Sequence, residues 1–179
     1  ARWAVPSIGA ILVPINTRFR DVDLGYILKQ SDCKGLLLTT RWHAVDYLAV
    51  LRDVVPDLDA QRPGNWAVDS LPELRFVVCT DDTVPPGMLA YTEVVERGAR
   101  GHGSVSALQQ ARSAIRPEDI AQILFTSGTT SFPKGAMVCH GALLQNNFNT
   151  IARLNLGMAD RYLATSPLFS ATGTSFTLS

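Results

Sequence analysis

Residues 120–139 read IAQILFTSGTTSFPKGAMVC, an apolar run, a loop rich in Ser, Thr and Gly, and a second apolar run. The run from Ile120 to Phe125 predicts a buried strand, and the run from Gly135 to Cys139 predicts a short strand after the loop. In open α/β sheets, ligands bind beyond the carboxyl ends of the strands. The loop that follows Phe125 therefore lies where a binding site is expected.

The composition of this loop suits a phosphate ligand. Gly128 and Gly135 permit positive φ angles and close approach of the backbone, so successive N–H groups can converge on an anion. Lys134 adds a mobile positive charge, and Pro133 restricts φ and stiffens the chain just before it. Further donors are the hydroxyl groups of Thr126, Ser127, Thr129, Thr130 and Ser131.

Two interpretations of the loop remain open at this point. One is a polyphosphate-binding loop, which the density of donors favours, and the other is a solvent-exposed turn between two strands. A P-loop NTPase is a poor fit, because the Walker A pattern requires Gly at the position of Pro133 and a hydroxyl group at the position of Gly135.

Short apolar runs alternate with helical patterns along the rest of the chain. Parallel strands between helices are apolar on both faces, so this alternation predicts an α/β protein with a largely parallel sheet flanked by helices. On the last helix, the side chains of Leu144, Phe148, Ile151 and Ala152 share one face, which we expect to be core. The other expected strands are 9–14, 35–39, 74–80 and 162–166. Helices are expected to begin near Asp21, Ala44 and Gly141. The expected surface connections are 56–72 and 97–113.

The overall composition excludes several classes of partner. The 179 residues are 46% hydrophobic and 18% charged, and sixteen basic residues balance sixteen acidic ones. Such a chain is a soluble globular domain without the basic surface that nucleic acid requires, and it has no apolar run of about 18 residues that would span a membrane. Cys33, Cys79 and Cys139 form no CxxC pair, which suits a reducing compartment and predicts a cytoplasmic protein with a small-molecule ligand.

Three segments resemble one enzyme family. Residues 123–140, ILFTSGTTSFPKGAMVCH, resemble the phosphate-loop signature of the adenylate-forming (AMP-binding) superfamily, which includes acyl-CoA synthetases, luciferases and peptide-synthetase adenylation domains. Residues 9–19, GAILVPINTRF, and residues 162–173, YLATSPLFSATG, resemble two other segments of that family in the same order. The resemblance covers nearly the whole chain and implies that residues 1–179 are a partial N-terminal AMP-binding domain, with the rest of that domain and the C-terminal domain absent.

The resemblance implies a ligase that uses ATP with Mg²⁺. A carboxylic acid would be activated to an acyl-adenylate and passed to a thiol, typically that of coenzyme A. Such an acid is ionised at neutral pH, so the reaction needs positioning and charge compensation rather than a general base. On this interpretation the full-length parent is the enzyme, and the fragment alone is inactive. The alternatives are a truncated non-catalytic fragment and an amino-acid-activating domain of a peptide synthetase.

Site residues follow from the resemblance position by position. The residues that would hold the phosphates and the departing pyrophosphate are Thr126, Ser127, Gly128, Thr129, Thr130 and Lys134. Ser131 stands where the family usually has Gly, and Ser170 stands where it usually has His, so we assign no catalytic residue and no protein ligand for the metal.

The remaining polar candidates are expected to have structural roles. Asp81 and Asp82 are adjacent and are expected to form a solvated turn rather than an acid/base pair. The three histidines, His43, His102 and His140, lack metal-ligand spacing. Ser127 and Ser170 lie outside any G-x-S-x-G pattern, which argues against a hydrolase.

Overall fold

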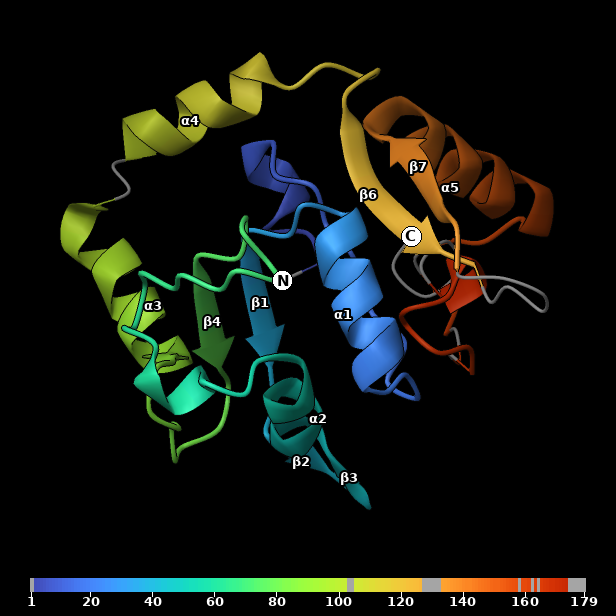
Figure 1. The fold of residues 1–179 in the computed structure, drawn as a ribbon. Coiled ribbons are helices and arrows are strands. Elements are labelled where there is room, and N and C mark those ends of the chain that lie inside the picture. The colour runs from blue at the N-terminus through green and yellow to red at the C-terminus, as the bar shows by residue number, and fades with distance from the viewer. Residues whose placement is uncertain are drawn as a thin grey trace. The chain divides into compact units, whose positions relative to one another are not determined.

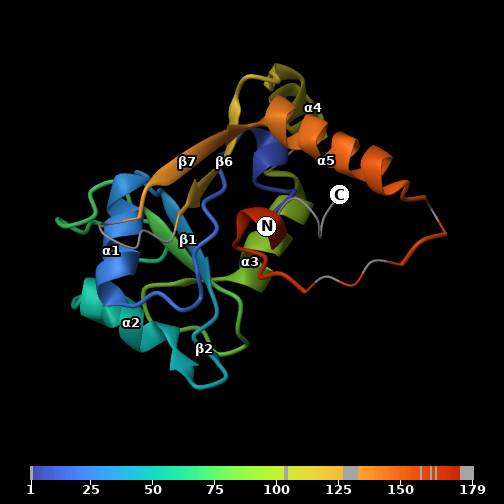
Figure 2. The same ribbon diagram turned by 90° about the vertical axis from the view of Figure 1, so that its right-hand side faces the viewer.

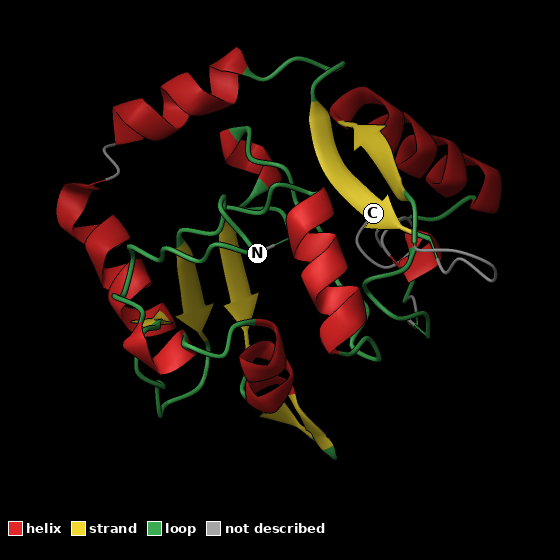
Figure 3. Cartoon of the chain, viewed as in Figure 1, coloured by secondary structure: helices red, strands yellow, loops and turns green. Residues whose placement is uncertain are grey.

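The computed structural model describes residues 2–102, 105–126, 133–157, 159–161, 163 and 165–173. Its chain forms two compact units, of which unit 1 comprises Ala1–Thr17 with Val105–Ser179 and unit 2 comprises Arg18–Ser104. Each unit combines helices with strands (Figures 1 and 3). The predicted α/β class is confirmed.

Unit 2 is built on a parallel sheet. Strands β1 (Gly35–Leu38), β4 (Phe76–Cys79) and β5 (Leu89–Ala90) lie in the order β1-β4-β5, and both pairings are parallel. The helices of this unit are α1 (Asp21–Gln30), α2 (Tyr47–Val54) and α3 (Tyr91–Arg97), with the short turns η2 (Leu58–Ala60) and η3 (Gly98–His102).

A small hairpin precedes α2 and shortens the predicted helix. Strands β2 (Arg41–Trp42) and β3 (Val45–Asp46) pair antiparallel, so the helix expected from Ala44 begins at Tyr47 instead. Asp46 fixes this start, because its Oδ1 accepts a hydrogen bond of 2.9 Å from the backbone N–H of Ala49. A side-chain acceptor at this position satisfies one of the unpaired N–H groups at a helix N-terminus.

The stretch 56–72 was expected to be a surface connection, and this is wrong. Leu58, Trp66 and Leu71 from this stretch are among the most buried side chains of the molecule. The Nε1–H of Trp66 donates a 2.6 Å hydrogen bond to the carbonyl of Gly87, so the one polar group of the indole is satisfied. The stretch looked like a loop because Pro, Gly and Asp surround its apolar residues, yet it folds into short turns that direct those residues inward.

The stretch 97–113 contains more regular structure than its composition predicted. Helix α4 spans Val105–Ala114 and has no buried residue. Its Ala, Gln and Arg residues favour helix, and this propensity prevails over the Gly-rich segment before it. The expected surface position is confirmed for α4, but the expected lack of structure is not.

Unit 1 contains the strands on either side of the predicted phosphate loop. Strands β6 (Ile120–Phe125) and β7 (Gly135–Cys139) have the predicted bounds and pair antiparallel. The strand expected at 9–14 is reduced to one parallel bridge, in which Leu12 lies opposite Gln122. The remaining elements of this unit are η1 (Pro6–Ile8), α4 and α5 (His140–Leu154).

The buried face of α5 differs from the prediction. Leu144 and Phe148, expected in the core, are 60% and 68% exposed, whereas Leu143 and Asn147 are 9% and 6% exposed. Both sets repeat at helical spacing, and the polar Asn147 made the true face look like the solvent side. Figure 2 shows α5 leaving the end of β7 at an angle to the two strands.

The C-terminal strand expected at 162–166 is not observed where the structure describes it. Leu163, Thr165 and Ser166 adopt no regular secondary structure, and Tyr162 and Ala164 lie outside the described residues. Among the described helices, none combines the length and the hydropathy needed to cross a lipid bilayer.

Candidate functional site

The ends of the predicted phosphate loop are held together by the β6–β7 hairpin. Phe125 pairs with Gly135, and one step beyond it the N–H of Thr126 donates a 3.0 Å hydrogen bond to the carbonyl of Lys134. The N–H of Lys134 in turn lies 3.4 Å from Oγ1 of Thr126. The hydrogen bonds between the two strands therefore extend to Thr126 and Lys134, which flank residues 127–133. These two predicted site residues lie side by side.

Gly135 is required here for a reason that the sequence did not indicate. Its φ angle is not positive, but a Cβ atom at this position would lie 2.8 Å from Cγ2 of Ile123 and 3.3 Å from Cζ of Phe125. Side chains of β6 thus fill the space beside β7. Glycine at 135 lets the two strands pair closely just below the loop.

Lys134 is an exposed cation at this position. It forms no ion pair within the part of the chain that the structure describes, and Thr126 beside it is also exposed. An ammonium group without a carboxylate partner remains available to an anion from solution. The other predicted site residues, Ser127, Gly128, Thr129 and Thr130, lie outside the described residues, as does Ser131.

The model of the family described as "AMP-binding enzyme" matches residues 1–179. The chain belongs to the AMP-binding enzyme family. The predicted membership of the adenylate-forming superfamily is thereby confirmed.

Two curated relatives of this family member are medium-chain acyl-CoA ligases by name. A mitochondrial medium-chain acyl-CoA ligase from Pongo abelii is 33% identical over 95% of this chain and 28% of its own length. The corresponding protein from Homo sapiens is 34% identical over 86% of this chain and 25% of its own length. The chain therefore spans less than a third of the length of either relative.

A solved structure shows the same fold. The anthranilate CoA ligase AuaEII, crystallised with anthranoyl-AMP, superposes with a TM-score of 0.66 at 21% identity. The similarity covers 97% of this chain and 29% of that one. This CoA ligase therefore contains the α/β fold described above.

The acidic pair at 81 and 82 has a structural role, at least in its first member. Asp81 accepts hydrogen bonds from Oγ1 of Thr39 at 2.5 Å, from the N–H of Thr40 at 2.7 Å and from Oγ1 of Thr40. The hydroxyl groups of Thr39 and Thr40, followed by the N–H of Thr40, hold the pKa of the Asp81 carboxyl group below its usual value. The carboxylate connects the segments that follow β1 and β4, and it is poorly suited to act as an acid.

Ser170 and His43 have structural roles in the described part of the chain. The hydroxyl group of Ser170 donates to the carbonyl of Pro167 at 2.8 Å and accepts from the N–H of Gly173 at 3.0 Å, which makes it part of a local turn. His43 has a φ of 51° between β2 and β3 and packs edge-on against Trp42. Among the described residues, no three His, Cys, Asp or Glu side chains gather closely enough to bind a metal ion.

Proposed function

We propose that residues 1–179 are part of an ATP-dependent ligase that activates a carboxylic acid and transfers it to a thiol, that of coenzyme A. One observation of this chain carries the proposal: Lys134, exposed and without an ion-pair partner among the described residues, lies beside Thr126 at the end of a hairpin whose connecting loop has the family signature. The names of the curated relatives, all CoA ligases in the cases given above, support coenzyme A as the acceptor.

In this proposal the phosphate loop acts by electrostatics and positioning. The ammonium group of Lys134 and the hydroxyl group of Thr126 would bind the phosphates of ATP and offset the charge that develops on pyrophosphate. Ser127, Gly128, Thr129 and Thr130 remain predicted partners in the same role. The attacking carboxylate, with a pKa of about 4 to 5, is ionised at neutral pH and needs no base from this segment.

Mg²⁺ would reach the site with ATP rather than through ligands of this segment. The described residues hold no group of three metal-binding side chains, so none of them is assigned to the ion. Metal bound through nucleotide phosphates commonly has few protein ligands. No part of the mechanism proposed for Lys134 depends on the position of the ion.

We also propose how the activity is distributed between residues 1–179 and the rest of the full-length protein. Residues 1–179 would form the first part of the larger N-terminal domain, and this segment alone would be inactive because the remaining substrate contacts lie elsewhere. A cytoplasmic location remains a prediction, since curated relatives include mitochondrial enzymes.

Replacement of Lys134 tests the proposed function in the full-length protein. Lys134→Ala should slow carboxylate-dependent exchange of pyrophosphate into ATP by about 10-fold to 100-fold, the effect of removing one charge-assisted hydrogen bond. Lys29→Ala removes an exposed lysine of α1 and is the matched control, with no expected loss.

Two results would count against the proposal. Exchange that is unchanged in Lys134→Ala would remove this side chain from the mechanism. Exchange that is absent from the full-length protein with aliphatic, aromatic and amino acids alike would exclude adenylate formation altogether.

A further inference from the structure

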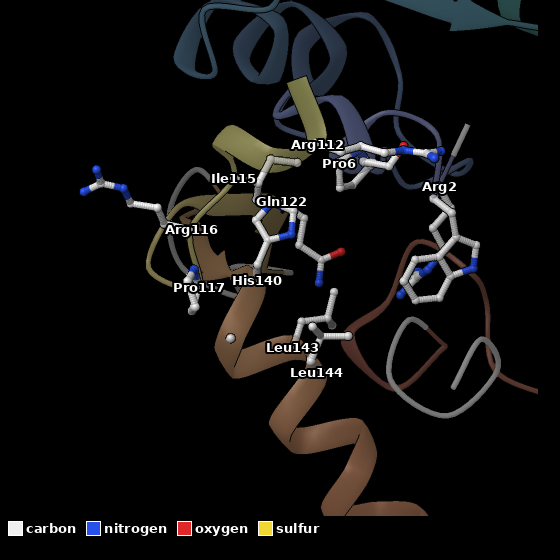
Figure 4. A pocket seen from close by; sticks show the side chains of 13 residues that line it. Arg2, Pro6, Arg112, Ile115, Arg116, Pro117, Gln122, His140, Leu143 and Leu144 are labelled. Atoms are coloured by element: carbon white, nitrogen blue, oxygen red, sulfur yellow. The ribbon is translucent and has the colours of Figure 1, made fainter. Parts of the chain in front are cut away.

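Unit 1 contains a cavity of about 440 Å³ near the end of the β6–β7 hairpin opposite the phosphate loop (Figure 4). It lies among η1, α4, β6 and the first turn of α5. Its walls are mainly apolar and include the side chains of Trp3, Pro6, Ile115, Leu143 and Leu144. A cavity of this size and lining, with a few polar groups, has the usual character of a small-molecule site.

The most unusual wall residue is Gln122. It is 3% exposed, and Figure 4 shows its side-chain amide projecting into the cavity. Among the described residues this amide has no hydrogen-bond partner, although the backbone of Gln122 is bridged to Leu12. An amide buried in an otherwise apolar strand destabilises the fold unless its hydrogen-bonding groups find partners.

A second polar group without a partner lies in the wall of the same cavity, which His140 helps to line. The Nε2 atom of His140 is buried and has no hydrogen-bond partner in the described part of the chain. The backbone holds this residue in place, because its N–H donates to the carbonyl of Asp119 at 3.0 Å and the N–H of Gly141 donates to the carbonyl of Pro117 at 2.7 Å. The ring is therefore presented to the cavity by a fixed turn.

The charges around the cavity favour an anion. Its lining includes Arg2, Arg112 and Arg116 but no acidic side chain among the described residues. The carboxylate of Asp119 is directed to its own turn, where it accepts a 2.8 Å hydrogen bond from the N–H of Arg116. The side chain of Arg116 points away from Gln122 in Figure 4, so Arg2 and Arg112 are the cations on the open side.

We propose that this cavity binds a small apolar carboxylic acid at a site separate from the phosphate loop. The carboxylate would accept hydrogen bonds from the side-chain N–H₂ of Gln122 and from Nε2–H of His140, and the apolar body would contact Trp3, Leu143 and Leu144. Gln122 and Thr126 are four residues apart along the chain, about 13 Å, so the site is independent of the proposed phosphate contacts.

The test is a titration of the ¹⁵N-labelled chain, residues 1–179, observed by NMR. Octanoate and benzoate should cause saturable shifts in the side-chain amide of Gln122 and the backbone amide of His140. Octan-1-ol and benzyl alcohol, which lack the carboxylate, should bind at least about tenfold more weakly because charge-assisted hydrogen bonds are lost.

Substitutions in the cavity wall locate the bound acid. Gln122→Leu should weaken octanoate binding about tenfold or more, with folding checked by the dispersion of the spectrum. If Gln122→Leu does not fold, Leu144→Trp serves instead, because Leu144 is 60% exposed and a larger ring there would fill the cavity. Leu154→Trp, at an exposed position of the same helix outside the cavity, is the control and should bind normally.

Three outcomes would overturn the proposal. The first is equal binding of octanoate and octan-1-ol, and the second is unchanged octanoate binding in Leu144→Trp. The third is loss of binding in Lys134→Ala with retention in Gln122→Leu, which would place the acid at the phosphate loop. If Lys134→Ala loses exchange activity but binds octanoate normally, the result supports both the proposed ligase function and a separate acid site in the cavity.

Discussion

Asp81 shows how one carboxylate can join two parts of a sheet. Its carboxylate oxygens accept hydrogen bonds from Thr39 and Thr40, which follow β1, while Asp81 itself follows β4. These donors stabilise the ionised form, so the pKa of Asp81 is lower in the folded protein than in the unfolded chain. A lowered carboxyl pKa contributes stability that is present above the unfolded value and is lost as the pH falls through the folded value.

The resulting prediction concerns stability in acid. Replacement Asp81→Asn should lower the free energy of unfolding at pH 7, and the difference from the unchanged chain should shrink below about pH 4, where unfolded aspartate is protonated. Urea denaturation at a series of pH values measures both curves. Asp82→Asn, one residue further and exposed, is the control and should follow the unchanged chain. A difference that persists unaltered at pH 2 would show that the charge of Asp81 is irrelevant.

Helix α5 is the element whose orientation matters most for unit 1. Adjacent residues lie on different sides of a helix, so Leu143 is buried and Leu144 is largely exposed. The two leucines therefore allow the same substitution to be compared at a buried and at an exposed position of one helix. The helix also carries His140 at its first position and so connects the hairpin with the cavity.

Truncation of these two leucines tests the observed face of α5. Leu143→Ala should lower the free energy of unfolding by about 2 to 4 kcal/mol, since the substitution removes buried methyl groups and leaves a cavity. Leu144→Ala should change it by less than about 0.5 kcal/mol. Urea denaturation followed by circular dichroism measures both. A larger loss of stability in Leu144→Ala than in Leu143→Ala would contradict the observed face and support the one predicted from the apolar residues.

Sequence patterns predicted the two strands beside the phosphate loop better than the buried face of α5 or the connections. β6 and β7 have the predicted bounds because each is an apolar run that ends at a loop signal. The buried side of α5 was missed because the pattern assigns apolar residues to the core, whereas the structure buries Asn147 and exposes Phe148. Segment 56–72 was wrongly assigned because isolated apolar residues such as Trp66 have no periodicity, and only tertiary packing reveals their burial.

The candidate sites were predictable to different degrees. Thr126 and Lys134 stand in a local motif, and the structure places them side by side as the ends of one loop. Gln122 and His140 stand out only in the folded chain, where Gln122 is 3% exposed and Nε2 of His140 is buried without a hydrogen-bond partner among the described residues. A single Gln inside the run 120–125 was the one signal available, and polar residues in strands are too common for that signal to be decisive.

At the scale of the whole molecule, the buried apolar side chains are unevenly divided. Unit 2 contains most of those described, including Trp66, Leu51 and Val77, whereas unit 1 contributes Pro6, Ala121, Pro133 and Leu143. Local stability follows the amount of buried apolar contact. We therefore expect unit 2 to be the more stable part of this chain.

Hydrogen exchange tests this difference between the units. Backbone amides of β4, the central strand of the parallel sheet, should exchange at least about tenfold more slowly than amides of β6 and β7. Mass spectrometry of deuterated peptides gives both rates in one experiment. Equal protection of these amides against exchange would mean that the two units unfold together, although unit 2 buries more apolar side chains.

The bridge between Leu12 and Gln122 has a consequence for the order of events during synthesis. Residues 18–104 are continuous and can fold as soon as they leave the ribosome, whereas the first segment of unit 1 must wait for β6. At about 5 to 20 residues per second, that delay is on the order of 5 to 20 s. During this time the nascent segment around Leu12 cannot form its bridge to Gln122, so the first segment of unit 1 is the last part of that unit to find its place.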